Sequence, residues 1–446
     1  MLLSHKFRYQ LELQIYFYYM INLNKNHLCL FFIIVSHFIF PAGYAEPIVI
    51  KGSALKNLLG TPVEKIRFCT RDSQAVVFQI DEVTNDGEYV CSEGEKPNSD
   101  SGNGILDSLD ELVFLWEDCQ PVSEQESLQL SDNMTRLRVS RGDEIREIYI
   151  SKDSAIPLSS ECYMHYDHRN RMLKTPWYYA QFAEDRFHFV KAGVKTAGTD
   201  KYIDLTDELR IEILLRALWG LIPIRYSEDN MVCLVKRFKT GPLRLIRRGD
   251  FHLNLGLGLK GSRAIVNQIC YPRIIKVPVY VHAPVRFGSF FRDAYIEMTP
   301  VLKNVPGFSF RIPQASFSRN ISGDQNLDTM INLLPNNQFM AVSDDSVGYG
   351  WVLKAEIVQQ YLQNSCFLYR KPSLRSGSAD CGFRLNIHNL PKGYYEITNW
   401  VLFQSGSFAN FKNEFKSVLK PVIVSTAQGD YSNELAASSV HKNSLE

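Results

Sequence analysis

The chain has 446 residues, with 49 Lys and Arg against 48 Asp and Glu and a formal net charge of +1. This balance argues against a nucleic acid or an anionic membrane as a general partner, because such binding depends on a surplus of basic residues. The length corresponds to one large or two ordinary domains, which can bury a core without relying on disulfides.

The first 45 residues predict export. Residues 28–40 form a mostly apolar run, which follows Lys25 and precedes small residues up to Ala45. This order matches a signal peptide cleaved after Ala45, with translation starting at Met20 to give the ordinary length. We therefore expect a periplasmic or extracellular protein with no integral membrane span after cleavage. An uncleaved anchor is the alternative, although the run is short for a membrane crossing.

Eight of the nine cysteines remain after removal of Cys29 with the signal segment. An even number of cysteines in an exported chain favours disulfides, and the chain has no Cys-x-x-Cys pair that would suggest a zinc ribbon. We expect supplementary disulfides, but the spacing does not fix their connectivity.

Alternation of period two dominates the remaining chain. Apolar residues occupy every second position in 253–259 and 275–281, as expected for strands with one buried face. The segment 204–220 also alternates more regularly than a helix would, so we predict a strand there. Many strands, short turns and few helices predict a mainly β protein built as an antiparallel β-sandwich.

A Ser-rich turn at 157–161 suggests a division of the chain. We expect a signal segment at 1–45, an N-terminal β-rich region at 46–160, and a larger β-sandwich region at 161–425. The polar residues 426–446 have the composition of a disordered tail.

An acidic, glycine-rich loop lies between two strand-like runs. If Gly104 takes the sixth position of a calcium loop, the six ligand positions fall on Ser99, Ser101, Asn103, Ile105, Asp107 and Asp110. Residues 104–110 resemble the second half of an EF-hand or dockerin-type loop, which implies oxygen ligands for Ca²⁺. Position 1 carries serine in place of aspartate, so the resemblance implies a weak, structural Ca²⁺ site. The alternative is an Asn-Gly turn with solvated carboxylates.

The wider block resembles a group of uncharacterised exported bacterial proteins. These proteins pair a Q-I-D-E strand, here residues 79–82, with a G-x-G-x-L-D-x-x-D-E-L-V-F segment, here residues 102–114. Residues 240–248 form a second shared segment. The group carries no established activity, and its strand-rich pattern is similar to that of large mutarotase-like supersandwiches and polysaccharide lyases.

Four other features admit both a functional and a structural interpretation. Residues 165–169 form a His-Tyr-Asp-His-Arg cluster, but strand geometry would place His165 and His168 on opposite faces. Tryptophans and tyrosines could stack on a carbohydrate, yet sandwich cores also use them. We interpret the arginines of 244–248 as a solvated strand face and the pair Asp81-Glu82 as a strand edge.

The sequence contains no nucleophile elbow, Walker A loop or His-Glu-x-x-His motif. The leading hypothesis is therefore an exported β-sandwich protein with a binding or structural role. The alternative is a carbohydrate-active enzyme, and a cleft that gathers His, Tyr, Arg and carboxylates would favour it.

Overall fold

The computed structural model describes most of the chain after the expected signal segment, which lies outside the described residues. The described ranges are 47–122, 134–152, 155–184, 188–256, 259–283, 286–303, 307–312, 317–320, 329–332, 339–344, 346–354, 364–370, 379–405, 422–426 and 429–433.

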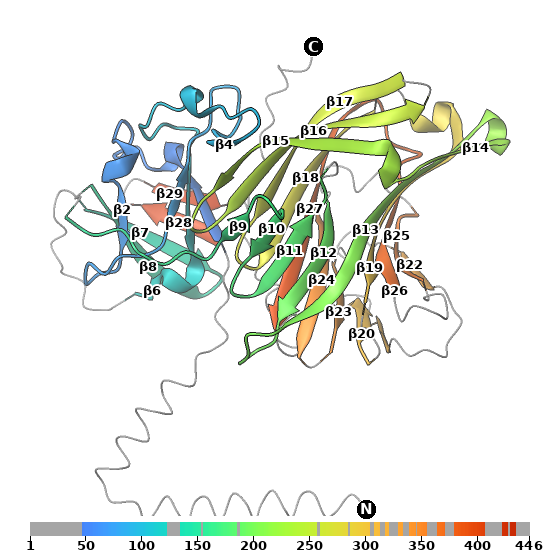
Figure 1. The fold of residues 1–446 in the computed structure, drawn as a ribbon. Helices are drawn as coiled ribbons and strands as arrows, with labels where there is room; N and C mark the ends of the chain where they lie inside the picture. Colours follow the sequence, from blue (N-terminus) through green and yellow to red (C-terminus); the bar gives the residue numbers. More distant parts are fainter. Residues whose placement is uncertain are drawn as a thin grey trace, which may run out of the picture. The chain divides into compact units, whose positions relative to one another are not determined.

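Two ten-stranded antiparallel sheets form the larger part of the fold (Figure 1). The first sheet contains, in spatial order, β22 (Thr329–Asn332), β25 (Cys366–Arg370), β26 (Ala379–Asn386), β19 (Phe291–Leu302), β13 (Tyr202–Ala217), β12 (Phe189–Lys195), β11 (Tyr178–Phe182), β10 (Met172–Lys174) and β9 (His165–Asp167), with β14 (Ile222–Tyr226) paired to β13. The second contains β21 (Phe317–Asn320), β20 (Ser309–Ile312), β23 (Phe339–Ser343), β24 (Val347–Lys354), β27 (Gly393–Ser405), β18 (Ile274–Ala283), β17 (Leu259–Cys270), β16 (Leu245–Gly256), β15 (Met231–Thr240) and β4 (Glu93–Gly94).

The predicted strand at 204–220 is confirmed. It corresponds to β13, which pairs with β19 along most of its length. Alternation of apolar and charged residues suits a strand between two neighbours, because successive side chains point to opposite faces of the sheet. Strand β13 ends at Ala217, where a short 3₁₀ turn leads into β14.

The main core lies between the two large sheets, whose inner faces supply it. Tyr178 and Phe182 of the first sheet are buried with Ile275, Trp351 and Phe403 of the second. The ring centroids of Tyr178 and Phe403 are 4.3 Å apart in a stacked arrangement. Two sheets with a shared apolar interior form a sandwich, so the predicted fold class is confirmed.

The N-terminal region contains two smaller antiparallel sheets. One has three strands, in the order β1 (Pro47–Lys51), β5 (Glu111–Leu115) and β3 (Gln79–Asp81). The other has six strands, β2 (Arg67–Cys69), β8 (Glu144–Ser151), β7 (Met134–Arg141), β28 (Val422–Thr426) and β29 (Gly429–Asn433), with β6 (Gln120–Pro121) paired to β8.

The C-terminal strands belong to this N-terminal region, which differs from the expected division. Strand β28 pairs with β7, and Val422 and Val424 are buried among the N-terminal apolar residues. Strand β29 falls within the expected tail at 426–446 and pairs with β28. Sequence alone could not reveal this arrangement, because the pairing joins residues nearly 300 positions apart and has no local signal.

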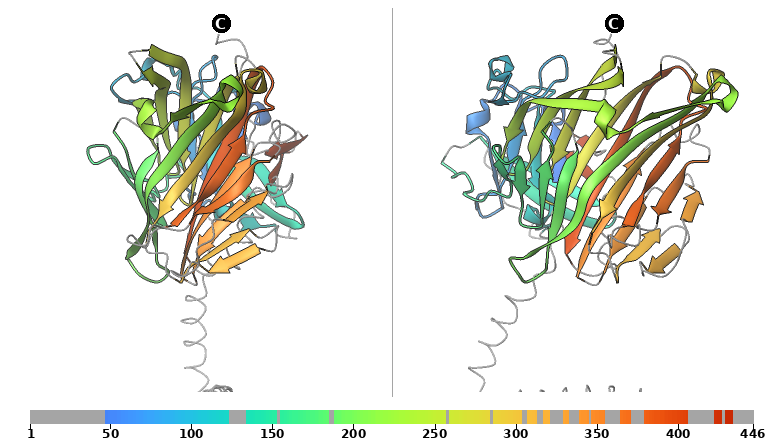
Figure 2. Two further views of the ribbon diagram at one scale, coloured as in Figure 1. Left: turned by 90° about the vertical axis from the view of Figure 1, so that its right-hand side faces the viewer. Right: turned by 45° about the vertical axis from the view of Figure 1, so that its right-hand side comes forward.

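A third apolar cluster joins the N-terminal region to the outer face of the second large sheet. Val113 and Leu115 of β5 pack there with Leu243, Ile246 and Trp400. The further views in Figure 2 show the two large sheets stacked along their length. Because one of these sheets carries apolar residues on both faces, it is covered on both sides.

All helical elements among the described residues are short 3₁₀ turns. They are η1 (Gly52–Ala54), η2 (Val63–Lys65), η3 (Ser99–Ser101), η4 (Trp116–Asp118), η5 (Leu218–Gly220), η6 (Glu228–Asn230) and η7 (Phe287–Ser289). None of the helices in the described part of the chain is long and apolar enough to cross a membrane.

The disulfide expectation finds no support in the structure. The eight cysteines after the signal segment all lie in the described ranges, and none of them is paired. Seven of the eight are buried, where a thiol behaves as a small apolar group.

Candidate functional site

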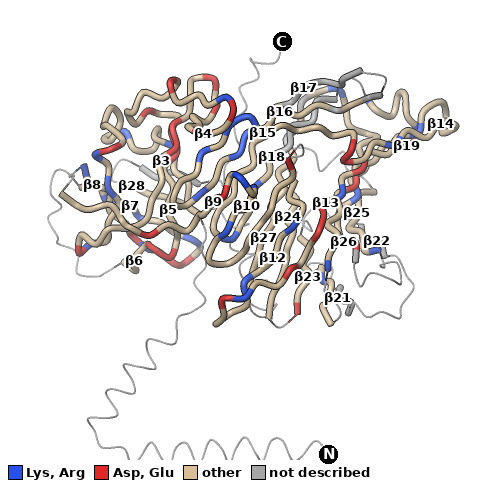
Figure 3. Tube along the Cα trace, viewed as in Figure 1, with Lys and Arg blue, Asp and Glu red and all other residues tan. Residues whose placement is uncertain are grey.

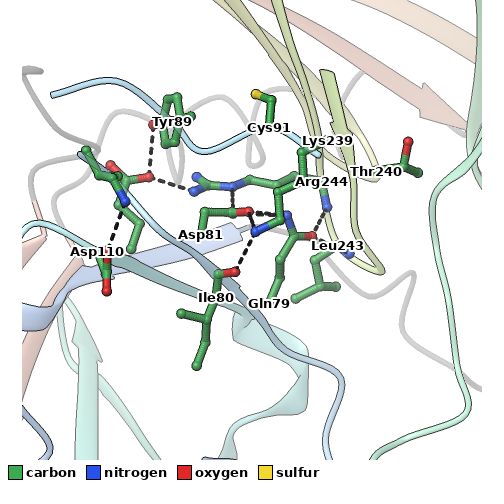
Figure 4. A network of polar contacts seen from close by, with 12 residues as sticks. Gln79, Ile80, Asp81, Tyr89, Cys91, Asp110, Lys239, Thr240, Leu243 and Arg244 are labelled. Atoms are coloured by element: carbon green, nitrogen blue, oxygen red, sulfur yellow. Dashed lines mark hydrogen bonds and ion pairs between the residues drawn. The ribbon is translucent and has the colours of Figure 1, made fainter. Parts of the chain in front are cut away.

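A buried network of charged and polar side chains connects β3 to the hairpin between β15 and β16 (Figure 4). Arg244 and Asp81 are both 0 % exposed, and Arg244 Nε donates a hydrogen bond to Asp81 Oδ2 at 2.5 Å. Gln79 Oε1 accepts the backbone N–H groups of Leu243 and Arg244, at 3.1 and 2.8 Å. The amide group of Gln79 also donates to Asp81, at 2.9 Å. The Q-I-D-E strand and the segment 240–248 are thus in direct contact.

Further groups balance the charges of this network. Arg244 Nη2 lies 2.7 Å from Glu111 Oε2, which also accepts a hydrogen bond from Tyr89 Oη at 3.0 Å. Lys239 Nζ lies 2.8 Å from Asp81 Oδ1 and donates to the Ile80 carbonyl. Two cations and two carboxylates therefore lie together, which is the condition under which buried charges are tolerated.

The pKa of Asp81 reflects this environment. Burial by itself would raise that pKa, but the Arg244 and Lys239 cations lower it below its ordinary value. The same burial and the neighbouring Glu111 raise the pKa of the Tyr89 hydroxyl, so it stays protonated and donates. Asp81 is therefore ionised and the Tyr89 hydroxyl protonated near neutral pH.

The structure corrects one sequence interpretation here. Arg244, Arg247 and Arg248 are buried, so they do not form a solvated face. Arg247 points into the sandwich core, with its guanidinium 3.7 Å from the centroid of the Phe182 ring. Asp81 does lie on an edge strand, because β3 is the outer strand of its sheet, but the hairpin between β15 and β16 covers it. Since Asp81 and Arg244 are inaccessible to a substrate, the network has a structural role: it holds β3 against the hairpin between β15 and β16.

The acidic loop is organised by carboxylates that bind its own backbone. Glu82 Oε1 accepts the N–H groups of Asn103 and Gly104, and Gly104 has a φ of +67°. Asp110 is buried, with Oδ1 accepting from Val83 N and Oδ2 from Asp107 N, both at 2.8 Å. Asp107 Oδ1 accepts from Leu109 N.

Asp107 and Asp110, the two carboxylates proposed as Ca²⁺ ligands, are therefore already engaged by hydrogen bonds from backbone N–H groups. Burial raises the pKa of Asp110 to about 6, against the effect of its backbone hydrogen bonds. Ser99 and Ser101 belong to the 3₁₀ turn η3 and are exposed, and the Ile105 backbone bridges to Pro62 instead of continuing a hairpin. No group of three or more His, Cys, Asp or Glu residues in the described ranges could hold a metal ion.

Calcium binding by this loop stays a prediction, and thermal unfolding tests it. A weak site with a dissociation constant of about 1 mM would add about 1.4 kcal/mol of stability at about 10 mM Ca²⁺. The unfolding midpoint should rise with Ca²⁺ and not with an equal concentration of Mg²⁺. An Asp107→Asn variant should lose the shift, whereas an unchanged midpoint of the natural chain at this concentration contradicts the site.

The His165 cluster lies on β9 and the turn that follows it. The His168 ring stacks on that of Phe238 with centroids 4.7 Å apart, and His165, Asp167 and His168 are all exposed. Asp167 accepts hydrogen bonds from the backbone and the side chain of Asn170, which lower its pKa. His165, Tyr166 and Asp167 line a hollow of about 660 Å³, in which Asp167 remains an ionised carboxylate.

The aromatic residues considered for carbohydrate stacking are mostly buried. Tyr178, Trp351 and Trp400 are each no more than 2 % exposed, and Tyr179 and Tyr395 are also buried. Because stacking on a sugar requires an open ring face, these residues act as core packing. They do not form a binding platform.

A second cavity, of about 460 Å³, gathers carboxylates at the edge of the N-terminal region. Its wall includes Glu117 and Asp118 of η4 together with Glu161, and we call this cavity the acidic cleft. Arg146 also lines it but is held by Glu144 at 2.7 Å. Figure 3 shows acidic residues beside β6, the strand that follows η4.

Asp118 is the carboxylate with the most perturbed environment in the acidic cleft. Burial raises its pKa to about 7, and the nearby Glu161 carboxylate adds to this effect. The carboxylate is hydrogen-bonded to the Leu115 backbone, but its Oδ2 atom is buried and has no hydrogen-bond partner among the described residues. An unsatisfied acceptor in a cavity is a candidate contact for a ligand.

Sequence reasoning missed the acidic cleft. Glu117 and Asp118 follow a buried strand, whereas Glu161 is the last residue of the expected boundary turn at 157–161. Tyr163 Oη donates to Glu161 Oε2 at 3.0 Å, which fixes that carboxylate. The only local signal was an acidic pair at a strand end, and such pairs are common on exposed turns.

Comparisons with known proteins identify no family. No family model matches the chain, and no curated protein matches it. Among solved structures, an α-mannosidase from Enterococcus faecalis is 8% identical, with a TM-score of 0.45 and coverage of 86% of this chain and 45% of that one. A glycosyl hydrolase family 38 protein from Enterococcus faecalis is also 8% identical, with a TM-score of 0.46 and coverage of 86% and 46%.

A more distant match is the heparan sulfate lyase HepC from Pedobacter heparinus. It is 9% identical, with a TM-score of 0.28 and coverage of 58% of this chain and 38% of that one. The chain spans less than half the length of each of these three proteins. At these TM-scores the likenesses carry no argument about activity.

Proposed function

We propose that the protein is a carbohydrate-binding β-sandwich protein whose ligand, a neutral oligosaccharide, enters the acidic cleft. The observation that carries the proposal is the buried Asp118 Oδ2 atom, which faces no partner among the described residues. A hydroxyl group of a sugar can donate to this atom, and hydrogen bonds to an ionised acceptor are stronger than neutral ones.

The charge of the acidic cleft narrows the ligand class. Three carboxylates line it, and its arginine is already paired with Glu144. An anionic sugar such as a uronate or a sulfated unit would meet like charges, whose repulsion disfavours binding. Neutral sugars supply the hydroxyl donors without this repulsion.

Calorimetry with neutral hexasaccharides of glucose, mannose and N-acetylglucosamine tests the proposal. We expect at least one to bind, and a galacturonate hexasaccharide to bind about tenfold more weakly or not at all, equivalent to about 1.4 kcal/mol. Asp118→Asn should weaken the interaction. The exposed Asp143, at the turn between β7 and β8, gives the matched control Asp143→Asn, which should bind normally. Equal binding by both variants would contradict the proposal.

The second candidate is hydrolysis or elimination in the same cleft. It is favoured by the pKa of about 7 for Asp118 beside the second carboxylate of Glu161, since a general acid needs a pKa near the working pH. Turnover by a general acid falls as pH rises above 7, whereas binding by an ionised acceptor strengthens. Product analysis of the hexasaccharides after incubation at pH 6 and pH 8 separates the two functions.

A further inference from the structure

The tip of the β13–β14 hairpin exposes an unusual set of apolar side chains. Strand β13 ends at Ala217, which pairs with Ile222 of β14 across the turn. The turn η7 lies near this hairpin end and packs against β19 (Figure 1). We call this surface the apolar tip. Its members and their exposed fractions are Leu218 (54%), Trp219 (85%), Leu221 (80%), Ile222 (46%) and Phe290 (62%).

The turn at the apolar tip holds two large apolar residues at positive φ. Leu218 has a φ of +47° and Trp219 a φ of +54°, in the left-handed region that usually selects Gly, Asn or Asp. Large apolar residues at such positions are disfavoured both by backbone strain and by contact with water. Strained residues cluster at binding and switch sites, so we expect a partner surface to cover these two side chains.

The charges around the apolar tip indicate the chemistry of that surface. The tip segments, residues 216–225 and 286–292, together contain four arginines and no aspartate or glutamate. All four are exposed, but Arg216 lies 3.7 Å from Asp293 and Arg225 pairs with Glu212, so Arg286 and Arg292 supply the net positive charge of the tip. Gly220 lies against the Arg292 side chain, so the two segments adjoin.

We infer that the apolar tip docks on the surface of an anionic phospholipid bilayer. Tryptophan favours the interface between headgroups and acyl chains, because its ring is apolar and its N–H is polar. Leucine and phenylalanine side chains enter the acyl boundary, while Arg286 and Arg292 at the base reach lipid phosphates. The near-neutral charge of the whole chain is compatible with this, since the attraction to anionic lipids acts over about a Debye length and depends on local groups such as Arg286 and Arg292.

Tryptophan fluorescence of the full chain with brominated phosphatidylglycerol vesicles tests the inference. Residues 1–45 contain no tryptophan, and the other four tryptophans are buried or half-buried, so contact quenching reports on Trp219. We expect strong quenching with phosphatidylglycerol and weak quenching with brominated phosphatidylcholine. Trp219→Phe should keep vesicle binding but lose most of the quenching.

Variants separate docking at the tip from other contacts. The double change Trp219→Ser with Leu221→Ser should lower vesicle affinity by about tenfold or more, since two exposed apolar side chains no longer enter the lipid. Ile145→Ser is the matched control, because Ile145 is 50% exposed but lies on β8, and it should bind like the natural chain. Arg286→Gln with Arg292→Gln should reduce the preference for phosphatidylglycerol.

Two results would overturn the inference. One is unchanged Trp219 emission at saturating vesicle concentration. The other is a dimer, seen by sedimentation without lipid, that Trp219→Ser abolishes, because a second copy of the chain would then cover the apolar tip. Neither result depends on the acidic cleft, so the proposed carbohydrate function stands or falls separately.

Discussion

Replacing Arg244 with methionine should destabilise the protein by about 3 to 5 kcal/mol, because it leaves buried carboxylates without their main counter-ion. Arg244 is fully buried and binds both Asp81 and Glu111. Methionine fills part of the space but provides no charge. Urea unfolding at pH 7, with the midpoint and the slope both recorded, measures the loss.

Arg225→Met is the matched control for this change. Arg225 pairs with Glu212, but its side chain is 64% exposed, so its loss should cost less than about 1 kcal/mol. If the two variants have the same stability, the Asp81–Arg244 pair does not hold β3 to the hairpin between β15 and β16.

The pH dependence gives a second readout of the same variant. Because the pKa of Asp81 is lowered in the folded chain, its contribution to stability is complete above the unfolded-state pKa of about 3.9. That contribution is lost as pH falls through the lower, folded-state pKa. Without Arg244 the pKa of Asp81 is less depressed, so Arg244→Met should unfold at a higher pH than the natural chain during acid titration.

Replacing Gly241 with alanine should cost about 2 to 4 kcal/mol by displacing Gln79. A Cβ atom at position 241 would lie 2.1 Å from Gln79 Oε1 and 2.2 Å from its Cδ, too close for any real contact. Gln79 is buried and accepts two backbone N–H groups, so moving it leaves those donors unsatisfied. Urea unfolding measures the change.

The neighbouring Thr240 provides the control for Gly241. Its hydroxyl is buried without a hydrogen-bond partner among the described residues, so Thr240→Ala should have a small effect. Combining Gly241→Ala with Gln79→Ala removes the clash, and the double variant should be less destabilised than the sum of the two single changes. Strict additivity would show that the close approach of Gly241 to Gln79 is not the cause.

The sequence was informative where the pattern is local. The alternation at 204–220 predicted β13, and the positive φ of Gly104 agrees with the Asn-Gly turn chemistry. The sandwich class followed from the same alternation. These features depend on residues that are close in the chain, so their signal is present in a short window.

The parts that sequence reasoning missed depend on distant contacts. The arginines of 244–248 look solvated in isolation, and only the approach of Gln79 and Asp81 from another sheet buries Arg244. The return of β28 to the N-terminal sheet and the meeting of Asp118 with Glu161 have the same origin. Burial of a charge depends on partners that no local pattern reveals.

The binding of a neutral hexasaccharide as a function of pH tests the central claim most directly. Because burial and Glu161 raise the pKa of Asp118 to about 7, this carboxyl gains its charge between about pH 6 and pH 8. We expect the affinity of the natural chain to rise across this range and that of Asp118→Asn to be weak and independent of pH. An affinity that does not change with pH in the natural chain, or the absence of binding to any of the neutral hexasaccharides, would contradict the account.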